Sequence, residues 1–202
     1  MNQESLSPLV RFPKEFPPGA TTLVAERDPL LAPGMSFQIR VMAPGETVRE
    51  RTIRETAWIL LHGEAEVTAG PVRASVARAS LFDERPTTLH VAAEADVTLT
   101  ARGPAEWAVV RAPNGRTFAP RLFLPQECGR ETRGRGLAQG ACEREVRLVF
   151  DRSTRPESML VVGEVVSGAG RWSSWPPHHH AQPELYHYRF SHRDGYGHAE
   201  CG

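Results

Sequence analysis

Residues 57–70 read AWILLHGEAEVTAG, and this stretch decides the fold class that the sequence predicts. An apolar run is followed by alternating polar and apolar residues, which is the pattern of a β-strand with one buried face. The segment stops at Gly70 and Pro71, a pair typical of turns. Inside it, Gly63 is expected to allow a tight corner, because glycine adopts backbone conformations that other residues avoid.

Segments of the same kind lie on both sides of this stretch, and no convincing helical segment interrupts them. They cover residues 37–46, 72–82, 87–93, 96–103 and 106–112. Short strands separated by turn residues predict an all-β sandwich or barrel. The proline-rich residues 1–34 are expected to form an arm or an edge strand, with a turn at Pro17-Pro18-Gly19.

The strand pattern is lost at residues 112–142 and then returns. Glycine, proline and arginine dominate that stretch, which indicates a solvated linker more than an RNA-binding segment. Strands are expected again over residues 143–150 and 159–168. The repeat predicts tandem barrels: residues 1–118, a linker at 119–142, and a second barrel at 143–202 that is incomplete. Its open face would be covered by the first barrel, by another subunit or by a further segment.

Composition limits the classes of partner and compartment. Lys plus Arg and Asp plus Glu both total 24, so charge gives no reason to expect nucleic acid or a membrane surface as a partner. Cys128, Cys142 and Cys201 show no C-x-x-C spacing, which favours a reducing compartment. No apolar run is long enough to cross a bilayer and no signal peptide is evident, so a cytoplasmic protein is expected.

Residues 172–190, WSSWPPHHHAQPELYHYRF, concentrate the groups that bind metals. In an extended strand, His178, His180 and Glu184 would point to one face. Two imidazoles and a carboxylate suit zinc, manganese or iron and leave positions open for water or substrate. The alternative is a solvated histidine-rich loop with no ligand. His179 and His187 have the opposite parity and are expected to face away.

A histidine-x-histidine-x3-glutamate strand after a glycine-rich turn resembles the first metal motif of the cupin superfamily. GAGRWSSWPPHHH followed by ELYHYRF further resembles the bacterial 5-deoxy-glucuronate isomerase family. FQIRVMAPGETV, LLHGEAEV, the APNG turn and MLVVGEVVSGAG resemble that family in the same order. The resemblance covers most of residues 20–200.

This resemblance implies a bicupin, with tandem double-stranded β-helix (jelly-roll) barrels and a metal only in the C-terminal one. His178, His180 and Glu184 match three of the family's metal ligands, and zinc or manganese is the expected metal, with no organic cofactor. The family's fourth ligand is a histidine that lies well beyond Glu184. His192 and His198 are the substitutes that these residues offer.

The implied reaction interconverts 5-deoxy-D-glucuronate and 5-dehydro-2-deoxy-D-gluconate in inositol catabolism. This chain is expected to be such an isomerase, or a truncated form of one with reduced activity. The partner would be a small sugar acid, and a homo-oligomer is possible. Tyr186 and Tyr188 share the parity of the three ligands, so they are candidates for positioning substrate or acting as the acid. Filling the barrel core is the alternative role for both tyrosines.

Other interpretations stay open at this point. The related 5-keto-4-deoxyuronate isomerase, another small-acid cupin enzyme, or a non-catalytic cupin that binds a sugar acid would each suit the pattern. His62 and His90 lack a second ligand at metal spacing and are expected to be packing or surface residues. Arg189 is expected at a surface or interface, and Trp58 and Trp107 in the first core.

Overall fold

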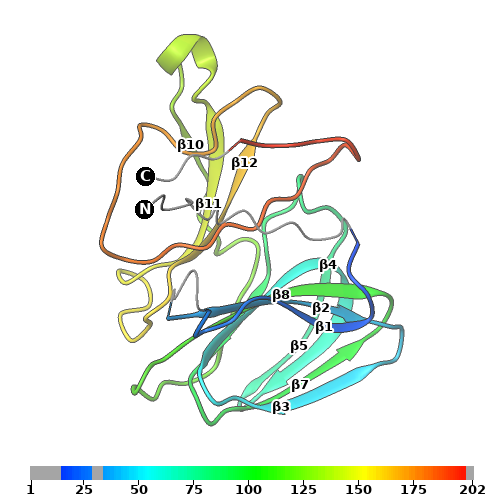
Figure 1. The fold of residues 1–202 in the computed structure, drawn as a ribbon. Helices are drawn as coiled ribbons and strands as arrows, with labels where there is room; N and C mark the ends of the chain where they lie inside the picture. Colours follow the sequence, from blue (N-terminus) through cyan, green and yellow to red (C-terminus); the bar gives the residue numbers. More distant parts are fainter. Residues whose placement is uncertain (1–14, 29–33, 199–202) are drawn as a thin grey trace, which may run out of the picture.

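The computed structural model describes residues 15–28 and 34–198, and its regular secondary structure consists almost entirely of strands (Figure 1). This confirms the all-β prediction. One short 3-10 turn, Leu137–Gly140, interrupts them. The strands are β1 Gly19–Val24, β2 Ser36–Met42, β3 Thr47–Arg51, β4 Glu55–Ala69, β5 Val72–Arg78, β6 Thr88–Val91, β7 Asp96–Ala101, β8 Ala105–Ala112, β9 Arg121–Phe123, β10 Glu131–Arg133, β11 Arg144–Phe150 and β12 Val162–Ser167.

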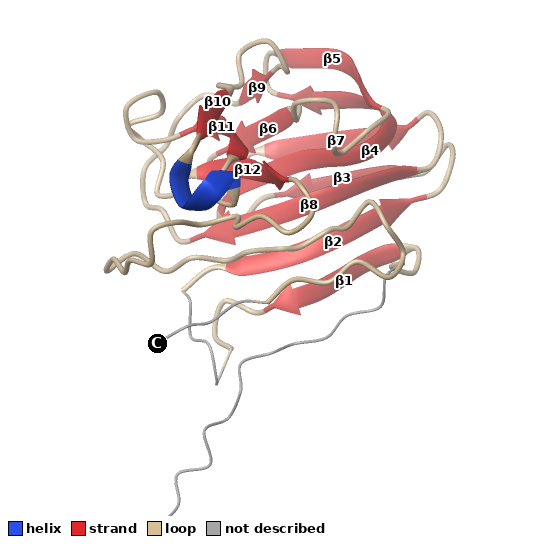
Figure 2. Ribbon diagram, turned by 90° about the horizontal axis from the view of Figure 1, so that it is seen from above, coloured by secondary structure: helices blue, strands red, loops and turns tan. Residues whose placement is uncertain are grey.

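The first nine strands form two layers that share the long strand β4 (Figure 2). One layer has the order β1-β2-β8-β4-β6-β9, and its pairs along this path are antiparallel. In the other layer β3 pairs with β7, β7 pairs with β4, and β4 pairs with β5. The first half of β4 therefore belongs to one layer and its second half to the other.

Gly63 lies where β4 passes between the layers, as the sequence predicts. Its φ is +101°, and an added Cβ would lie 2.2 Å from the carbonyl oxygen of Pro104. The pairing of β4 with β8 also shifts register just before this point, between Leu60 and His62. Only glycine fits the corner without displacing the backbone of the loop before β8.

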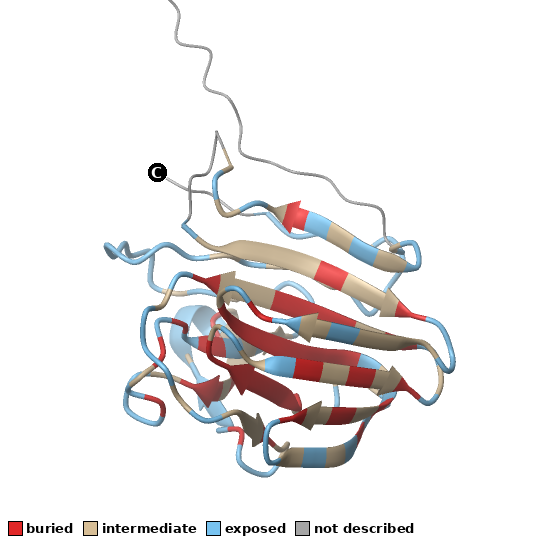
Figure 3. Ribbon diagram, turned by 90° about the horizontal axis from the view of Figure 1, so that it is seen from below, coloured by how far each residue is buried: buried red, intermediate tan, exposed pale blue. Residues whose placement is uncertain are grey.

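The main core fills the space between the two layers. Trp58 on β4 and Trp107 on β8 are its largest members, and their rings meet edge to face with centroids 6.5 Å apart. The assignment of both tryptophans to the core is thus confirmed. Small and branched side chains from β4, β6, β7 and β8 complete it. Figure 3 shows the buried residues mainly within the strands and the exposed ones mainly in the loops. The alternation in residues 64–69 reflects this one-sided burial.

A second core joins the first layer to the C-terminal sheet. Strands β10, β11 and β12 form a separate antiparallel sheet. Val149, Phe150 and Val162 from this part of the chain pack against Ile39 and Ile59 on the outer face of the first layer. The N-terminal strands, one of the three expected covers, therefore cover this side of the C-terminal sheet. Apolar side chains on another side stay exposed, among them Met159, Val161 and Val165.

Two buried arginines reinforce the same junction. Arg78, at the end of β5, donates to the carbonyl oxygen of Leu60 at 2.9 Å and to both carboxylate oxygens of Glu164 on β12 at 2.8 Å. Arg147 on β11 donates to the carbonyl oxygens of Leu81 and Glu84. Nε of Arg147 also pairs with Glu145 at 2.5 Å. A carboxylate therefore compensates the charge of each guanidinium, which a buried cation requires.

Several strands depart from the predicted boundaries. Strand β3, TVRER, has no strong apolar alternation, and pairing with β7 defines it. Residues 119–142, expected as a linker, contain β9, which pairs with β6 of the first layer, and β10, which pairs with β11. Strand β1 is an edge strand, as expected. The rest of the predicted arm at residues 1–14 and 29–33, and Cys201, lie outside the described residues.

None of the helical turns in the described residues has the length and apolar character needed to cross a membrane.

Candidate functional site

The predicted site residues all lie in residues 171–190, which we call the strap. The sequence predicts a strand here, and that prediction is wrong, because the strap follows β12 as an irregular connection (Figure 1). Pro176, Pro177 and Pro183 lack the backbone N–H that a ladder requires. Within the described residues no strand pairs with the strap.

The predicted alternation nevertheless holds in the second half of the strap. Glu184, Tyr186 and Tyr188 are exposed, whereas His187 and Arg189 are partly buried. The parity that groups Glu184 with the tyrosines is therefore confirmed. The structure adds the direction, since this group faces outward and the opposite group faces the first layer.

His178 is held in the tautomer that leaves one nitrogen free for a ligand. Its Nδ1 lies 2.7 Å from the carbonyl oxygen of Pro176. Because a carbonyl oxygen only accepts, Nδ1 carries the proton and Nε2 keeps its lone pair. A carbonyl that orients a histidine in this way is a common outer partner in metal sites.

His180 and Glu184 already lie in contact. The Nε2 atom of His180 is 3.0 Å from Oε1 of Glu184, and the rings of His178 and His180 have centroids 6.1 Å apart. Across residues 15–28 and 34–198, no three histidine, cysteine or acidic side chains are grouped closely enough to hold a metal ion. The structure therefore brings two of the three predicted ligands together and places the third nearby. Two imidazoles and a carboxylate fit a borderline divalent ion by their donor chemistry.

The two histidines considered as a fourth ligand do not complete a cluster. Nδ1 of His192 accepts the backbone N–H of Asp194 at 3.2 Å, and its side chain is exposed. Among residues 15–28 and 34–198, neither His192 nor His198 belongs to a group of side chains that could hold a metal ion.

Tyr186 and Tyr188 stack with ring centroids 6.1 Å apart and an interplanar angle of 20°. Their exposed fractions are 54% and 49%, so neither fills a core in the described structure. Partial burial and the neighbouring carboxylate of Glu184 raise the pKa of Tyr186 above its ordinary value. The hydroxyl of Tyr186 is therefore protonated at neutral pH and available as a donor.

The end of the strap is fastened to the first layer by Arg189. Its guanidinium pairs with Glu106 on β8, and its Nε donates to Nε2 of His187 at 2.9 Å. The His187 ring in turn lies 5.4 Å from the ring of Phe37 on β2. Burial and the charge of Arg189 lower the pKa of His187 to about 4, so this histidine is neutral. Arg189 is thus an interface residue between strap and sheet, as predicted.

The start of the strap is fastened to the loop that leads into β11. The backbone N–H of Trp172 donates to the carbonyl oxygen of Ala141 at 2.8 Å, and Arg171 pairs with Glu143 at 2.9 Å. Residues between these two attachments include His178, His180 and Glu184. The predicted ligands therefore lie on a connection that is fixed at both ends.

The sequence does not predict a buried polar cluster that surrounds Glu55. The carboxylate of Glu55 accepts hydrogen bonds from Nε2 of His90 at 2.7 Å, from Nδ2 of Asn114 at 2.7 Å, and from the hydroxyl of Ser158. Nδ1 of His90 accepts from Nε of Arg155 at 3.1 Å, which fixes the proton on Nε2. His90 is a packed residue, as expected, but it also links the first layer to the loop before β12. A glutamate at the start of the apolar strand β4 is the feature of the sequence that could have indicated this buried cluster.

His62, the other lone histidine, is exposed, and its Nδ1 lies 3.2 Å from the carbonyl oxygen of Ala79. It is a surface residue, as expected.

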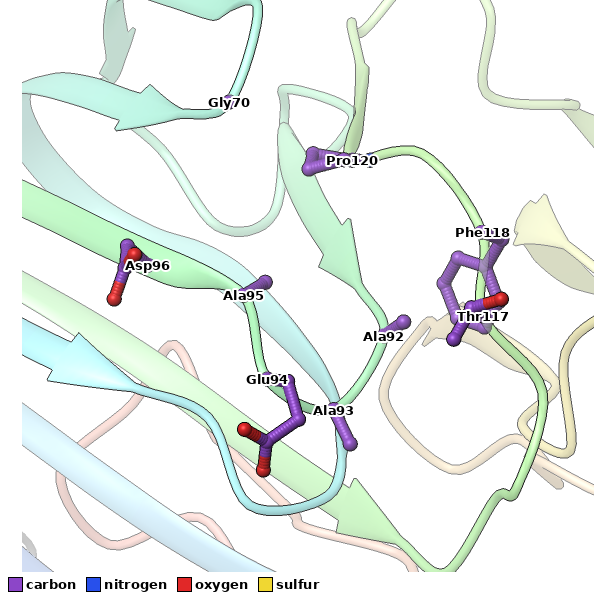
Figure 4. A pocket seen from close by; sticks show the side chains of 9 residues that line it. All are labelled: Gly70, Ala92, Ala93, Glu94, Ala95, Asp96, Thr117, Phe118 and Pro120. Atoms are coloured by element: carbon purple, nitrogen blue, oxygen red, sulfur yellow. The ribbon is translucent and has the colours of Figure 1, made fainter.

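An open hollow of about 340 Å³ lies elsewhere, beside β7 (Figure 4). Phe118 lies on one side of it, and Glu94 and Asp96 lie on another. Both carboxylates pair with Arg51, at 3.0 and 3.4 Å. None of the predicted site residues lines the hollow, and its acidic groups are already compensated.

The antiparallel fold of two layers makes this an all-β protein, and the strap presents histidines, a carboxylate and tyrosines on its outside. A family model described as KduI/IolB matches residues 10–201, and the chain belongs to this family.

Curated relatives carry the name 5-deoxy-glucuronate isomerase. The protein of that name from Geobacillus kaustophilus is 35% identical over 157 residues, covering 76% of this chain and 55% of that protein. The one from Shouchella clausii is 29% identical over 166 residues, covering 80% and 59%. The chain thus spans little more than half the length of these relatives.

A solved structure, described as an IolB-like protein from Salmonella typhimurium LT2, superposes with a TM-score of 0.68. Its sequence is 26% identical, and the match covers 80% of this chain and 60% of that one.

Proposed function

We propose that this chain acts as an isomerase that interconverts 5-deoxy-D-glucuronate and 5-dehydro-2-deoxy-D-gluconate, with one divalent metal, zinc or manganese, at the strap. The observation that carries the proposal is the similarity to proteins named 5-deoxy-glucuronate isomerase over three quarters of the chain. The contact of His180 with Glu184 and the tautomer of His178 support the placing of the site.

His178, His180 and Glu184 would hold the metal. When bound, a divalent ion supplies a Lewis acid that stabilises negative charge on a substrate oxygen. For binding, the proton that His180 shares with Glu184 must leave, because an imidazole coordinates through a lone pair. His178 needs no such change, since Nδ1 already carries its proton.

An aldehyde-to-ketone isomerisation moves a proton between neighbouring carbons and another between their oxygens. Tyr186 suits the donor role at an oxygen, because its hydroxyl is protonated at neutral pH and interacts with Glu184. Its interaction with Glu184 provides a path by which that proton is exchanged with a carboxylate. Tyr188, stacked on Tyr186, would limit the directions in which the Tyr186 ring can turn.

Turnover of the aldehyde acid tests this proposal directly. The purified chain is incubated with 5-deoxy-D-glucuronate and zinc or manganese, and proton NMR follows the loss of the aldehyde signal. We expect conversion by the unaltered chain and by His179→Ala, and none by His180→Ala. Absence of conversion by the unaltered, metal-loaded chain would refute the proposed activity. Conversion only of a 5-keto-4-deoxyuronate offered in parallel would select the alternative isomerase.

A further inference from the structure

The outer face of the C-terminal sheet carries an arginine that the proposed metal site does not use. Arg144 begins β11, and the register places it directly opposite Arg133 on β10 and Ser167 on β12. Residues directly opposite one another in antiparallel strands share a face of the sheet. Two guanidiniums and a hydroxyl therefore lie on the same face.

Arg144 is held by carbonyl groups alone. Its Nη1 donates to the carbonyl oxygen of Cys142 at 2.9 Å, and its Nη2 donates to the carbonyl oxygen of Trp175, in the strap, at 3.1 Å. Among the residues that the structure describes, no carboxylate lies within 4.0 Å of its side-chain nitrogens. A guanidinium presents more N–H donors than these two bonds use. Arg144 therefore has a fixed position, an uncompensated charge and free donors.

The other arginines nearby are already paired. Arg133 bonds to Glu131 at 3.0 Å, Arg171 to Glu143 at 2.9 Å, and Arg189 to Glu106. This difference singles out Arg144 as the cation near the strap with capacity for an external anion.

Ser167 supplies an independent sign of a missing partner. Its hydroxyl oxygen is buried and has no hydrogen-bond partner within the described structure. A buried hydroxyl without a partner is unfavourable, and an acceptor oxygen bound beside Arg144 would satisfy it. The bond from Nη2 of Arg144 to the carbonyl oxygen of Trp175 places this guanidinium beside the strap.

We propose that Arg144, assisted by the hydroxyl of Ser167, binds the carboxylate of the sugar acid and so selects acids over neutral sugars. The planar fork of a guanidinium matches the two oxygens of a carboxylate, which a lysine ammonium does not. The substrate class, a sugar acid, rests on the proposed function, whereas the carboxylate site rests on the contacts of Arg144 and Ser167. The metal ligands would act at the carbonyl end of the same molecule.

Binding of simple sugars tests this without any turnover. D-glucuronate and D-glucose are titrated into the zinc-supplemented chain, and saturation-transfer NMR or calorimetry gives each dissociation constant. The variants are Arg144→Gln, Arg144→Lys and, as the matched control on the same face, Arg133→Gln. Near-ultraviolet circular dichroism of each variant establishes that its packing is native.

We expect the unaltered chain and Arg133→Gln to bind D-glucuronate more tightly than D-glucose. Arg144→Gln should weaken D-glucuronate binding by about tenfold or more, because a charge-assisted bond is lost, and leave D-glucose unchanged. Arg144→Lys should restore part of the preference. If Arg144→Gln does not fold, loss of the preference in Ser167→Ala supports the assignment and its persistence there overturns it.

Equal affinity of the unaltered chain for both sugars, or an unchanged preference in folded Arg144→Gln, overturns the assignment. Selective binding that depends on Arg144 but occurs without conversion of 5-deoxy-D-glucuronate would refute the proposed isomerase activity and leave the carboxylate site standing.

Discussion

Replacing Glu55 by glutamine should remove a large part of the stability of the chain and much of its sensitivity to acid. The Glu55 side chain is fully buried. Its carboxylate accepts from His90, Asn114, the Ser158 hydroxyl and the backbone N–H of Met159, the last at 2.9 Å. Burial alone would raise the pKa, but these hydrogen bonds together outweigh it and lower the pKa of Glu55 from 4.5 to about 2.

This depression sets the size and sign of the effect. The difference between 4.5 and about 2 corresponds to about 3 kcal/mol of stabilisation by the ionised form. Because the folded-state pKa is the lower one, the stabilisation is fully present above pH 4.5 and is lost as the pH falls towards 2. Glutamine keeps the volume but turns one acceptor oxygen into a donor that faces other donors. We therefore expect Glu55→Gln to lower the free energy of unfolding at pH 7 by about 3 kcal/mol.

Urea unfolding followed by tryptophan fluorescence at a series of pH values measures both quantities. The unaltered chain should lose stability steeply between pH 4.5 and 2, and Glu55→Gln should show a much flatter dependence there. Glu66→Gln, which changes a carboxylate that is only partly buried, is the control and should behave nearly as the unaltered chain. The effect of an ordinary surface substitution is roughly 0.5 kcal/mol or less. If the free energy of unfolding of Glu55→Gln at pH 7 lies within that range of the value for the unaltered chain, this account of Glu55 is wrong.

Two further substitutions probe the corner of β4 and the junction between the sheets. Gly63→Ala should lower the free energy of unfolding by about 3 kcal/mol or more, because φ is +101° and the new Cβ would meet a backbone oxygen. Gly103→Ala, where the new Cβ has open space, should lower it by less than about 1 kcal/mol. Equal thermal midpoints for the two variants would contradict this account of the corner. Arg78→Met should lower the free energy of unfolding by about 3 to 5 kcal/mol, because it leaves Glu164 and several carbonyl oxygens poorly paired. Arg102→Ala, which removes one side of an exposed ion pair, should lower it by less than about 1 kcal/mol. Chemical denaturation measures both values, and a small effect of Arg78→Met would show that its ion pair adds little.

The sequence predicts the two-layered part well because its strands are strongly patterned. Alternation in residues 64–69 reflects a strand with one face in the core, and Gly63 marks the change of layer. Strand β3 was missed because TVRER has no such alternation, and only its pairing with β7 defines it. Local patterns cannot reveal a strand whose stability comes from its neighbour.

The site was predictable in composition and less so in shape. The spacing of His178, His180 and Glu184, with the resemblance to a family, identifies the segment, but consecutive prolines exclude the expected strand. The cluster around Glu55 was out of reach for a different reason. His90 is 35 residues from Glu55 in sequence and Ser158 is 103 residues away, so only the folded structure shows that they meet.

Equilibrium zinc binding against a chromophoric chelator tests whether His178, His180 and Glu184 hold one divalent metal. The unaltered chain and His179→Ala should each bind one zinc with the same affinity. His178→Ala, His180→Ala and Glu184→Gln should each weaken binding by at least about a hundredfold, because each removes a ligand. Retention of tight, one-to-one zinc binding when all three are replaced together, or an equal loss in His179→Ala, would contradict the account.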